Sequence, residues 1–243
     1  MGKSLGIHPY RGDIPAEQIV RGMEVIDRNS REILDDAKLL LEHGRYARAL
    51  SLSVIAYEES VKKAALLSLY AVQANDKLRK KFWQEYRSHT TKSSFLVRRA
   101  AVRGAFEGQN IEEKSQRIGK IMDLYKQLGF YADSYETDEG DKFWANPSES
   151  VTPESAKETF EMISRLVGSP VDKMEDEKLR KFRWQVIRAI DEHPQDQVLE
   201  RTLAVVRAVV GTARDFSDDE LANNLQKQVR TLLREENRPT EDT

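Results

Sequence analysis

Two short groups of ionisable residues interrupt otherwise apolar helical patterns in the sequence. Glu58, Glu59 and Lys62 form the first group, and His89 and Lys92 form the second. A carboxylate, an ammonium group and an imidazole can together transfer protons and stabilise developing negative charge. The imidazole suits either proton role because its unperturbed pKa lies near neutrality. These five residues are therefore the candidate catalytic residues.

The first group is predicted to face the interior of a helix bundle. A helix is expected from about residue 45 to residue 74. With residues placed about 100° apart around the axis, Glu58 and Lys62 fall inside the apolar stripe and Glu59 at its edge. A buried carboxylate needs a partner, and an acid one helical turn before a lysine favours an intrahelical pair. We therefore predict that Glu58 pairs with Lys62.

The second group has the same interpretation in a helix that continues from about residue 76 to residue 106. His89 then faces the core, and Lys92 lies just beside that face. Each residue taken alone also fits a structural role, either in an ion pair that fixes helix register or as a hydrogen-bonded core histidine. Two helices that present acid and base groups to one interior indicate a polar pocket instead.

A strongly basic stretch surrounds the second group. Between residues 78 and 103 the chain has eight basic side chains and one acid, with four aromatic residues interleaved. Such a stretch can follow a phosphate backbone and stack bases, although it is equally typical of a solvated helix face. The candidate nucleic-acid-binding residues are Arg79, Lys80, Tyr86, Arg87, Arg98 and Arg99.

Composition predicts an all-α protein. The 243 residues include few glycines and prolines, and long stretches consist of good helix formers. The sequence has neither a membrane-spanning apolar run nor a signal-peptide core, so we expect a cytoplasmic protein without membrane contact. The absence of cysteine excludes disulfides, thiolate metal sites and thiol catalysis, and four scattered histidines disfavour a classical zinc site, so we predict neither a metal nor a cofactor.

Caps and periodicity predict a helical bundle with one irregular stretch. The acidic, aromatic-rich residues 130–150 are predicted to be a long loop that packs against the bundle. Ser169 and Pro170 mark the expected boundary between a helical domain at 1–168 and a C-terminal extension at 169–243 that packs on the same core. The expected helices cover about residues 13–44, 45–74, 76–106, 111–128, 153–168, 176–193, 197–215 and 217–236.

These residues carry a resemblance to a known family. The run from residue 33 to residue 67 resembles the AbiV family of abortive-infection proteins, a branch of the HEPN superfamily. The first group matches that family's Glu-Glu-x-x-Lys motif, and the second matches its His-x-x-Lys motif. The segment 129–133 and the pair Asn146-Pro147 are similar to later features of the family. The resemblance covers about residues 19–167 and does not extend through the C-terminal helices.

Membership would imply an all-α, HEPN-like bundle, here with additional C-terminal helices, that forms a homodimer in a bacterial or archaeal cytoplasm. It would imply anti-phage defence by a toxin with metal-independent ribonuclease activity, RNA as the substrate, and a phage-derived activator or an antitoxin protein as regulator. Catalytic HEPN domains carry an arginine shortly before the histidine, but Phe82, Trp83 and Gln84 stand at that spacing here. Arg188 and His193 reproduce the spacing outside the matching region, and we interpret them as a chance match.

The resemblance suggests a mechanism for cleavage of RNA. A base removes the 2′-hydroxyl proton, the oxygen attacks the adjacent phosphorus, and an acid protonates the leaving 5′-oxygen. His89 could fill either proton role, while Lys62 and Lys92 stabilise the phosphoryl oxygens. Glu58 or Glu59 would orient these groups or serve as the base.

Two alternatives belong to other functional classes. A non-catalytic HEPN-like module would bind nucleic acid or a protein and use the Glu/Lys/His cluster only structurally, and the missing arginine favours this alternative. A metal-dependent carboxylate enzyme on a helix bundle would need Glu-x-x-His repeats, which neither group of residues supplies. We therefore rank the metal-dependent enzyme last.

Overall fold

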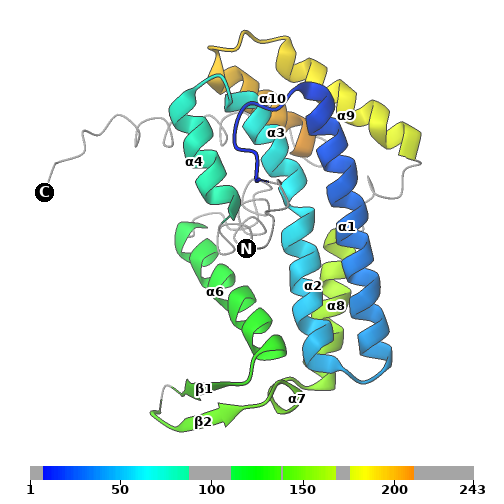
Figure 1. Cartoon of the computed structure of the whole chain (residues 1–243), viewed down its shortest axis with the longest axis vertical. Coiled ribbons are helices and arrows are strands. Elements are labelled where there is room, and N and C mark those ends of the chain that lie inside the picture. The colour runs from blue at the N-terminus through cyan, green and yellow to red at the C-terminus, as the bar shows by residue number, and fades with distance from the viewer. Residues whose placement is uncertain (1–7, 88–110, 138, 168–175, 211–243) are drawn as a thin grey trace, which may run out of the picture.

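The computed structural model describes residues 8–87, 111–137, 139–167 and 176–210, and it is mostly helical with one small two-stranded sheet (Figure 1). The predicted all-α class is confirmed. Along the chain the elements are α1 (Ala16–Glu42), α2 (Tyr46–Ser60), α3 (Lys62–Val72), α4 (Asp76–Arg87), α6 (Ile111–Phe130), β1 (Asp133–Glu136), β2 (Lys142–Ala145), α7 (Pro147–Ser150), α8 (Pro153–Val167), α9 (Asp176–Asp191) and α10 (Val198–Val210).

Helices α1 and α2 form an antiparallel hairpin against which α3, α6, α8 and α9 pack, whereas α4 and α10 contact α3. Gly44 ends α1 with a φ of +71°, a conformation that glycine adopts without steric cost. The amides of Gly44 and Arg45 then donate to the carbonyls of Leu41 and Leu40, at 3.1 and 2.8 Å, which closes the helix end. Helix α2 packs against three other helices, α1, α6 and α8 (Figure 1).

Small residues on α2 allow α6 to approach closely. Ala47 and Ser51 are buried, and the Ser51 hydroxyl lies 2.9 Å from the Tyr125 carbonyl and 3.1 Å from that of Lys126. A Cβ atom on Gly129 would lie 1.8 Å from Ser51 Oγ and 2.2 Å from the Ala47 carbonyl oxygen. Gly129 was expected to end the helix, but α6 continues to Phe130, and the glycine instead permits this contact.

Two apolar clusters make up the core. The first joins α1, α3, α9 and α10 through residues such as Ile19, Leu66, Ile187 and Val205. The second joins α2, α6 and α8 through Val54, Met122 and Ile163, among others. Helices α9 and α10 therefore share apolar packing with α1 and α3, while the predicted boundary between residues 168 and 169 stays a prediction.

The single helix expected over residues 45–74 is interrupted at Val61. This residue has φ −72° and ψ −16° and separates α2 from α3. Just before it, the Tyr57 carbonyl accepts from both the Ser60 hydroxyl at 2.8 Å and the Val61 amide at 3.1 Å. The interruption falls inside the Glu-Glu-x-x-Lys motif.

The prediction of a packed loop over residues 130–150 is wrong. Residues 133–136 and 142–145 pair as an antiparallel hairpin, with Tyr135 opposite Phe143 and Ser134 opposite Trp144. The sequence does not show the alternation of polar and apolar residues that is typical of a strand, because polar and aromatic residues occur on both faces of this hairpin. The aromatic rings are also largely exposed, with Tyr131 at 65% and Trp144 at 78%.

Replacing Gly129 with alanine is expected to destabilise the fold by about 1–3 kcal/mol, because the added methyl group overlaps Ser51 and the α2 backbone. Gly22→Ala in α1 is the matched control: its Cβ would meet only the flexible Leu66 Cδ1 atom, at 2.9 Å, and alanine favours the helix. Urea unfolding of both variants measures the difference. Equal stability of the two would contradict the close contact.

Candidate functional site

The residues of the Glu-Glu-x-x-Lys motif separate into two environments. Glu58 is buried and its Oε1 lies 2.8 Å from Nζ of Lys126 on α6. Lys126 is also within 3.2 Å of Asp123 Oδ1. The predicted pair between Glu58 and Lys62 is therefore wrong. The angular projection assumed a helix that continues through Val61, and it could not include a cation brought by another helix.

Glu59 and Lys62 pair with each other across the interruption at Val61. Their side chains remain 16% and 21% exposed, so solvent reaches both groups. Lys62 Nζ also lies 5.8 Å from the centroid of the Tyr86 ring, on the last turn of α4. The described part of the chain therefore brings together Glu59, Lys62 and Tyr86, three residues that the sequence selected.

Tyr86 sits in an aromatic cluster between opposite charges. Its pKa is raised, chiefly by burial and further by the nearby Glu59 carboxylate, while the Arg11 guanidinium acts in the opposite direction. Its ring centroid lies 5.7 Å from that of Phe82 and 5.4 Å from that of Trp83. Trp83 is buried, so these aromatic residues pack on one another and the Trp83 ring is not open to stack a base.

The candidate nucleic-acid-binding residues differ in their surroundings. Arg79 pairs with Asp13 at 2.5 Å and Asp76 at 2.6 Å, and the hydrogen bond to Asp13 is the main cause of its raised pKa. Lys80 is exposed. Arg87 ends α4, and the structure describes its backbone but not its side chain. His89, Lys92, Arg98 and Arg99 lie outside the described residues.

A second buried charge cluster was missed by the sequence interpretation. Asp27 of α1 forms ion pairs with Lys63 of α3 and Arg183 of α9, and both Asp27 and Arg183 are buried. Burial lowers the pKa of Arg183, and the Glu24 carboxylate partly offsets that effect. An available signal was the position of Asp27 within the apolar face of α1. Lys63 directly follows Lys62, so this cluster anchors the start of α3.

Arg188 and His193 do not join the motif site. Arg188 is exposed near the end of α9, and the His193 carbonyl accepts a hydrogen bond from Arg201 at 2.9 Å. Arg201 also donates to the carbonyl of Ala71, at the C-terminal end of α3. The motif lies at the opposite end of that helix, about 15 Å away by its rise per residue.

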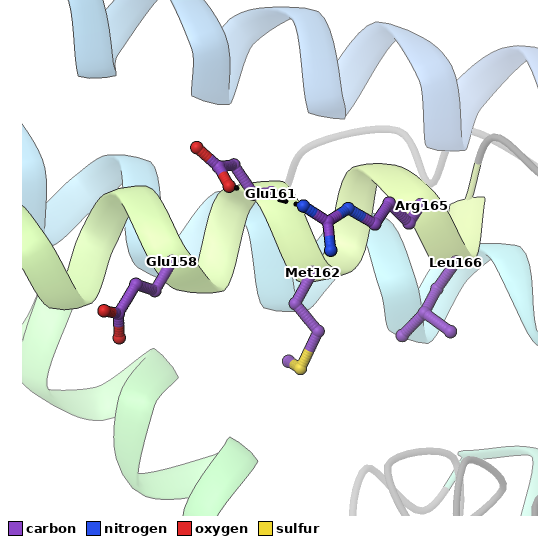
Figure 2. A pocket seen from close by; sticks show the side chains of 5 residues that line it. All are labelled: Glu158, Glu161, Met162, Arg165 and Leu166. Atoms are coloured by element: carbon purple, nitrogen blue, oxygen red, sulfur yellow. Dashed lines mark ion pairs between the residues drawn. The ribbon is translucent and has the colours of Figure 1, made fainter.

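An open depression on α8 is also separate from the motif. Figure 2 shows its lining side chains, and the ion pair between Glu161 and Arg165 is 3.5 Å long. Glu58, Glu59 and Lys62, the catalytic candidates that the structure describes, do not line it. Among the described residues, no three histidine or acidic side chains gather as metal ligands, and no described helix is long and apolar enough to cross a membrane.

Asp27→Asn is expected to lower the free energy of unfolding by about 3–5 kcal/mol, because it leaves the buried Arg183 without its counter-charge. Asp36→Asn, at an exposed position of the same helix, should change it by less than about 0.5 kcal/mol. Chemical denaturation of the two variants checks the difference. A small effect at Asp27 would refute the anchoring role.

Stability at high pH should depend on Tyr86. Its pKa in the folded state lies above the unfolded value of 10.0, so its contribution to stability is complete below that value. This contribution is lost as the pH rises from the Tyr86 pKa of the unfolded chain to the Tyr86 pKa of the folded chain. Between about pH 9 and 11, Tyr86→Phe should therefore lose less stability than the wild-type chain. Tyr131→Phe, at an exposed ring, is the control and should follow the wild type; an unchanged decline in Tyr86→Phe would contradict the prediction.

Comparison with known proteins gives a family. The model of the HEPN family described as AbiV matches residues 18–168, more than half of the chain and nearly the range expected from the motifs. No curated protein and no solved structure matches the chain. The match includes the Glu59, Lys62 and Tyr86 site and ends before α9. The chain therefore belongs to the AbiV family of HEPN proteins.

Proposed function

We propose that this protein acts in abortive infection as a metal-independent endoribonuclease that cleaves host or phage RNA and so blocks translation. In this proposal it is a cytoplasmic homodimer whose activity is controlled by a phage-derived activator or an antitoxin protein. The observation that carries the proposal is the solvent-accessible pair of Glu59 and Lys62 beside Tyr86, where α4 meets the start of α3.

The pair supplies one half of the required chemistry. Lys62 is a cation that can stabilise negative charge on the phosphoryl oxygens during attack. Glu59 holds the lysine side chain in place and leaves part of it accessible. The neighbouring Tyr86 ring limits the access of water to one side, which strengthens electrostatic interactions with a bound phosphate.

His89 and Lys92 are proposed to supply the other half. His89 stands three residues after Tyr86, and covalent geometry limits that separation to about 11 Å between Cα atoms. An imidazole within this reach can remove the 2′-hydroxyl proton or protonate the leaving 5′-oxygen. Lys92 would add a second cation for the phosphate. The mechanism requires the 2′-hydroxyl and so restricts cleavage to RNA.

Glu58 has a different role in this proposal. Its burial and its contact with Lys126 make it an anchor between α2 and α6, so we remove it from the catalytic candidates. The same observation favours a second candidate function for the chain, a non-catalytic HEPN-like module in which every charged group of the motif is structural. Variants of the two adjacent glutamates can separate these functions.

The test is cleavage of RNA in EDTA, with 2′,3′-cyclic phosphate ends as the expected product. His89→Ala should lower the rate by about 10²–10⁴-fold while the chain stays folded. Glu59→Gln should also lower the rate with little loss of stability, since its side chain is partly exposed. A wild-type protein that cuts RNA only after divalent metal is added would refute this mechanism.

Glu58→Gln is the matched control. It should cost about 1–3 kcal/mol of stability because Lys126 loses its buried partner, and the rate per folded molecule should stay near that of the wild type. Circular dichroism melts and the cleavage assay measure the two effects. If folded His89→Ala and Glu59→Gln both retain full activity, the non-catalytic module is the better description.

A further inference from the structure

The segment before α1 is fixed against α3 and α4. The Ile14 amide donates to Gln73 Oε1 at 2.9 Å, and Gln73 Nε2 donates to the Ile14 carbonyl at 3.2 Å. One residue earlier, Asp13 pairs with Arg79 of α4 at 2.5 Å. These contacts set the path of residues 8–15 and therefore the position of Arg11.

Arg11 lies over the aromatic wall beside the motif. Its guanidinium carbon is 5.0 Å from the centroid of the buried Trp83 ring. The Trp83 and Tyr86 centroids are 5.4 Å apart, and Lys62 Nζ is 5.8 Å from the Tyr86 centroid. The two cations therefore each lie near one ring of a T-shaped pair, although they come from widely separated parts of the sequence.

The charge of Arg11 is not neutralised within the described part of the chain. Its hydrogen bond there runs from Nη1 to the Tyr10 carbonyl at 2.7 Å, and no described carboxylate forms an ion pair with it. Arg79, in contrast, is paired with two acids. A half-buried guanidinium with most of its N–H groups available is suited to bidentate binding of a phosphate.

The electrostatics of Tyr86 agree with this placement. The Arg11 guanidinium lowers the pKa of the Tyr86 phenol, and the Glu59 carboxylate raises it. The phenol is therefore within electrostatic reach of both groups. Arg11 precedes the part of the chain that matches the family, so it is a feature of this chain's N-terminal segment.

We propose that Arg11 and Lys62 are the two arms of a phosphate-binding site on the wall formed by Trp83 and Tyr86. This inference rests on the proposed ribonuclease function, and it states that Arg11 binds a phosphodiester of the RNA at the reacting site. The planar guanidinium over Trp83 binds the phosphate oxygens, and Lys62 adds a point charge beside the neighbouring Tyr86 ring. A free phosphate has the same chemistry, so the experiment separates the two sources.

The test measures affinity of the full chain for a 2′-O-methyl RNA oligonucleotide, which cannot be cleaved, by fluorescence anisotropy at about 50–200 mM salt. Arg11→Leu keeps an apolar cover over Trp83 but removes the charge. It should weaken binding about 5–20-fold and reduce the slope of log affinity against log salt by about one. Arg11→Lys should recover the slope but only part of the affinity, because an ammonium group lacks the bidentate fork of the guanidinium.

Arg165→Leu is the control, because it removes the same charge at a position that is 81% exposed on α8. It should leave both the affinity and the salt slope unchanged. Circular dichroism confirms that each variant is folded. If Arg11→Leu binds the RNA like the wild type, with the same slope, Arg11 only covers Trp83 and the inference is overturned.

Competition by inorganic phosphate, measured at constant ionic strength, distinguishes an RNA phosphodiester from free phosphate as the ligand of this site. Competition with RNA in the wild type and its loss in Arg11→Leu support a shared phosphate site. Phosphate binding that depends on Arg11, together with RNA binding that does not, overturns the RNA assignment. Cleavage of RNA by the wild-type protein is measured separately. If no cleavage occurs, the proposed ribonuclease function is wrong. RNA binding that requires Arg11 would still support the phosphate-binding site.

Discussion

A charge buried among apolar helices must have an opposite charge beside it, because the cost of removing it from water otherwise exceeds what packing supplies. Two such pairings determine how this bundle is assembled. Glu58 and Lys126 join α2 to α6, and Asp27 joins α1 to Lys63 on α3 and Arg183 on α9. Apolar contacts tolerate small shifts between helices, whereas these ion pairs require particular residues to meet. The α2–α3 junction is consequently held from two directions.

The order of charges along the chain explains why the accessible site lies at this junction. In the run Glu58-Glu59-Ser60-Val61-Lys62-Lys63, the outer glutamate and the outer lysine are the anchors. The inner glutamate and the inner lysine pair with each other and keep contact with solvent. The interruption at Val61 lies between the inner glutamate and the inner lysine. Within one short motif, two charges therefore anchor helices and two remain accessible to solvent.

The sequence was sufficient for most helices within the described residues and for the family, because apolar periodicity and capping residues are local signals; the expected helix at 217–236 and the part of the 76–106 helix after residue 87 lie outside the described residues. It was insufficient for the pairing partners. A helical projection shows which side chains face inward, but the cation that meets Glu58 belongs to a helix more than fifty residues later. The β-hairpin was missed for a related reason: Phe143 and Trp144 are exposed, contrary to the expectation that aromatic residues of this segment pack inward. The roles of His89 and Lys92 stay predictions, since both lie outside the described residues.

Counting basic residues also could not identify which cations are available to a ligand. Arg79 belongs to the basic stretch, yet Asp13 and Asp76 already neutralise it, and its function is to hold the N-terminal segment on α4. That attachment in turn brings Arg11, which lies far outside the basic stretch, to the rings beside Lys62. Positive potential at a site depends on the charges left unpaired after folding rather than on the number of basic residues in a segment. By this criterion Arg11 contributes more to the site than Arg79.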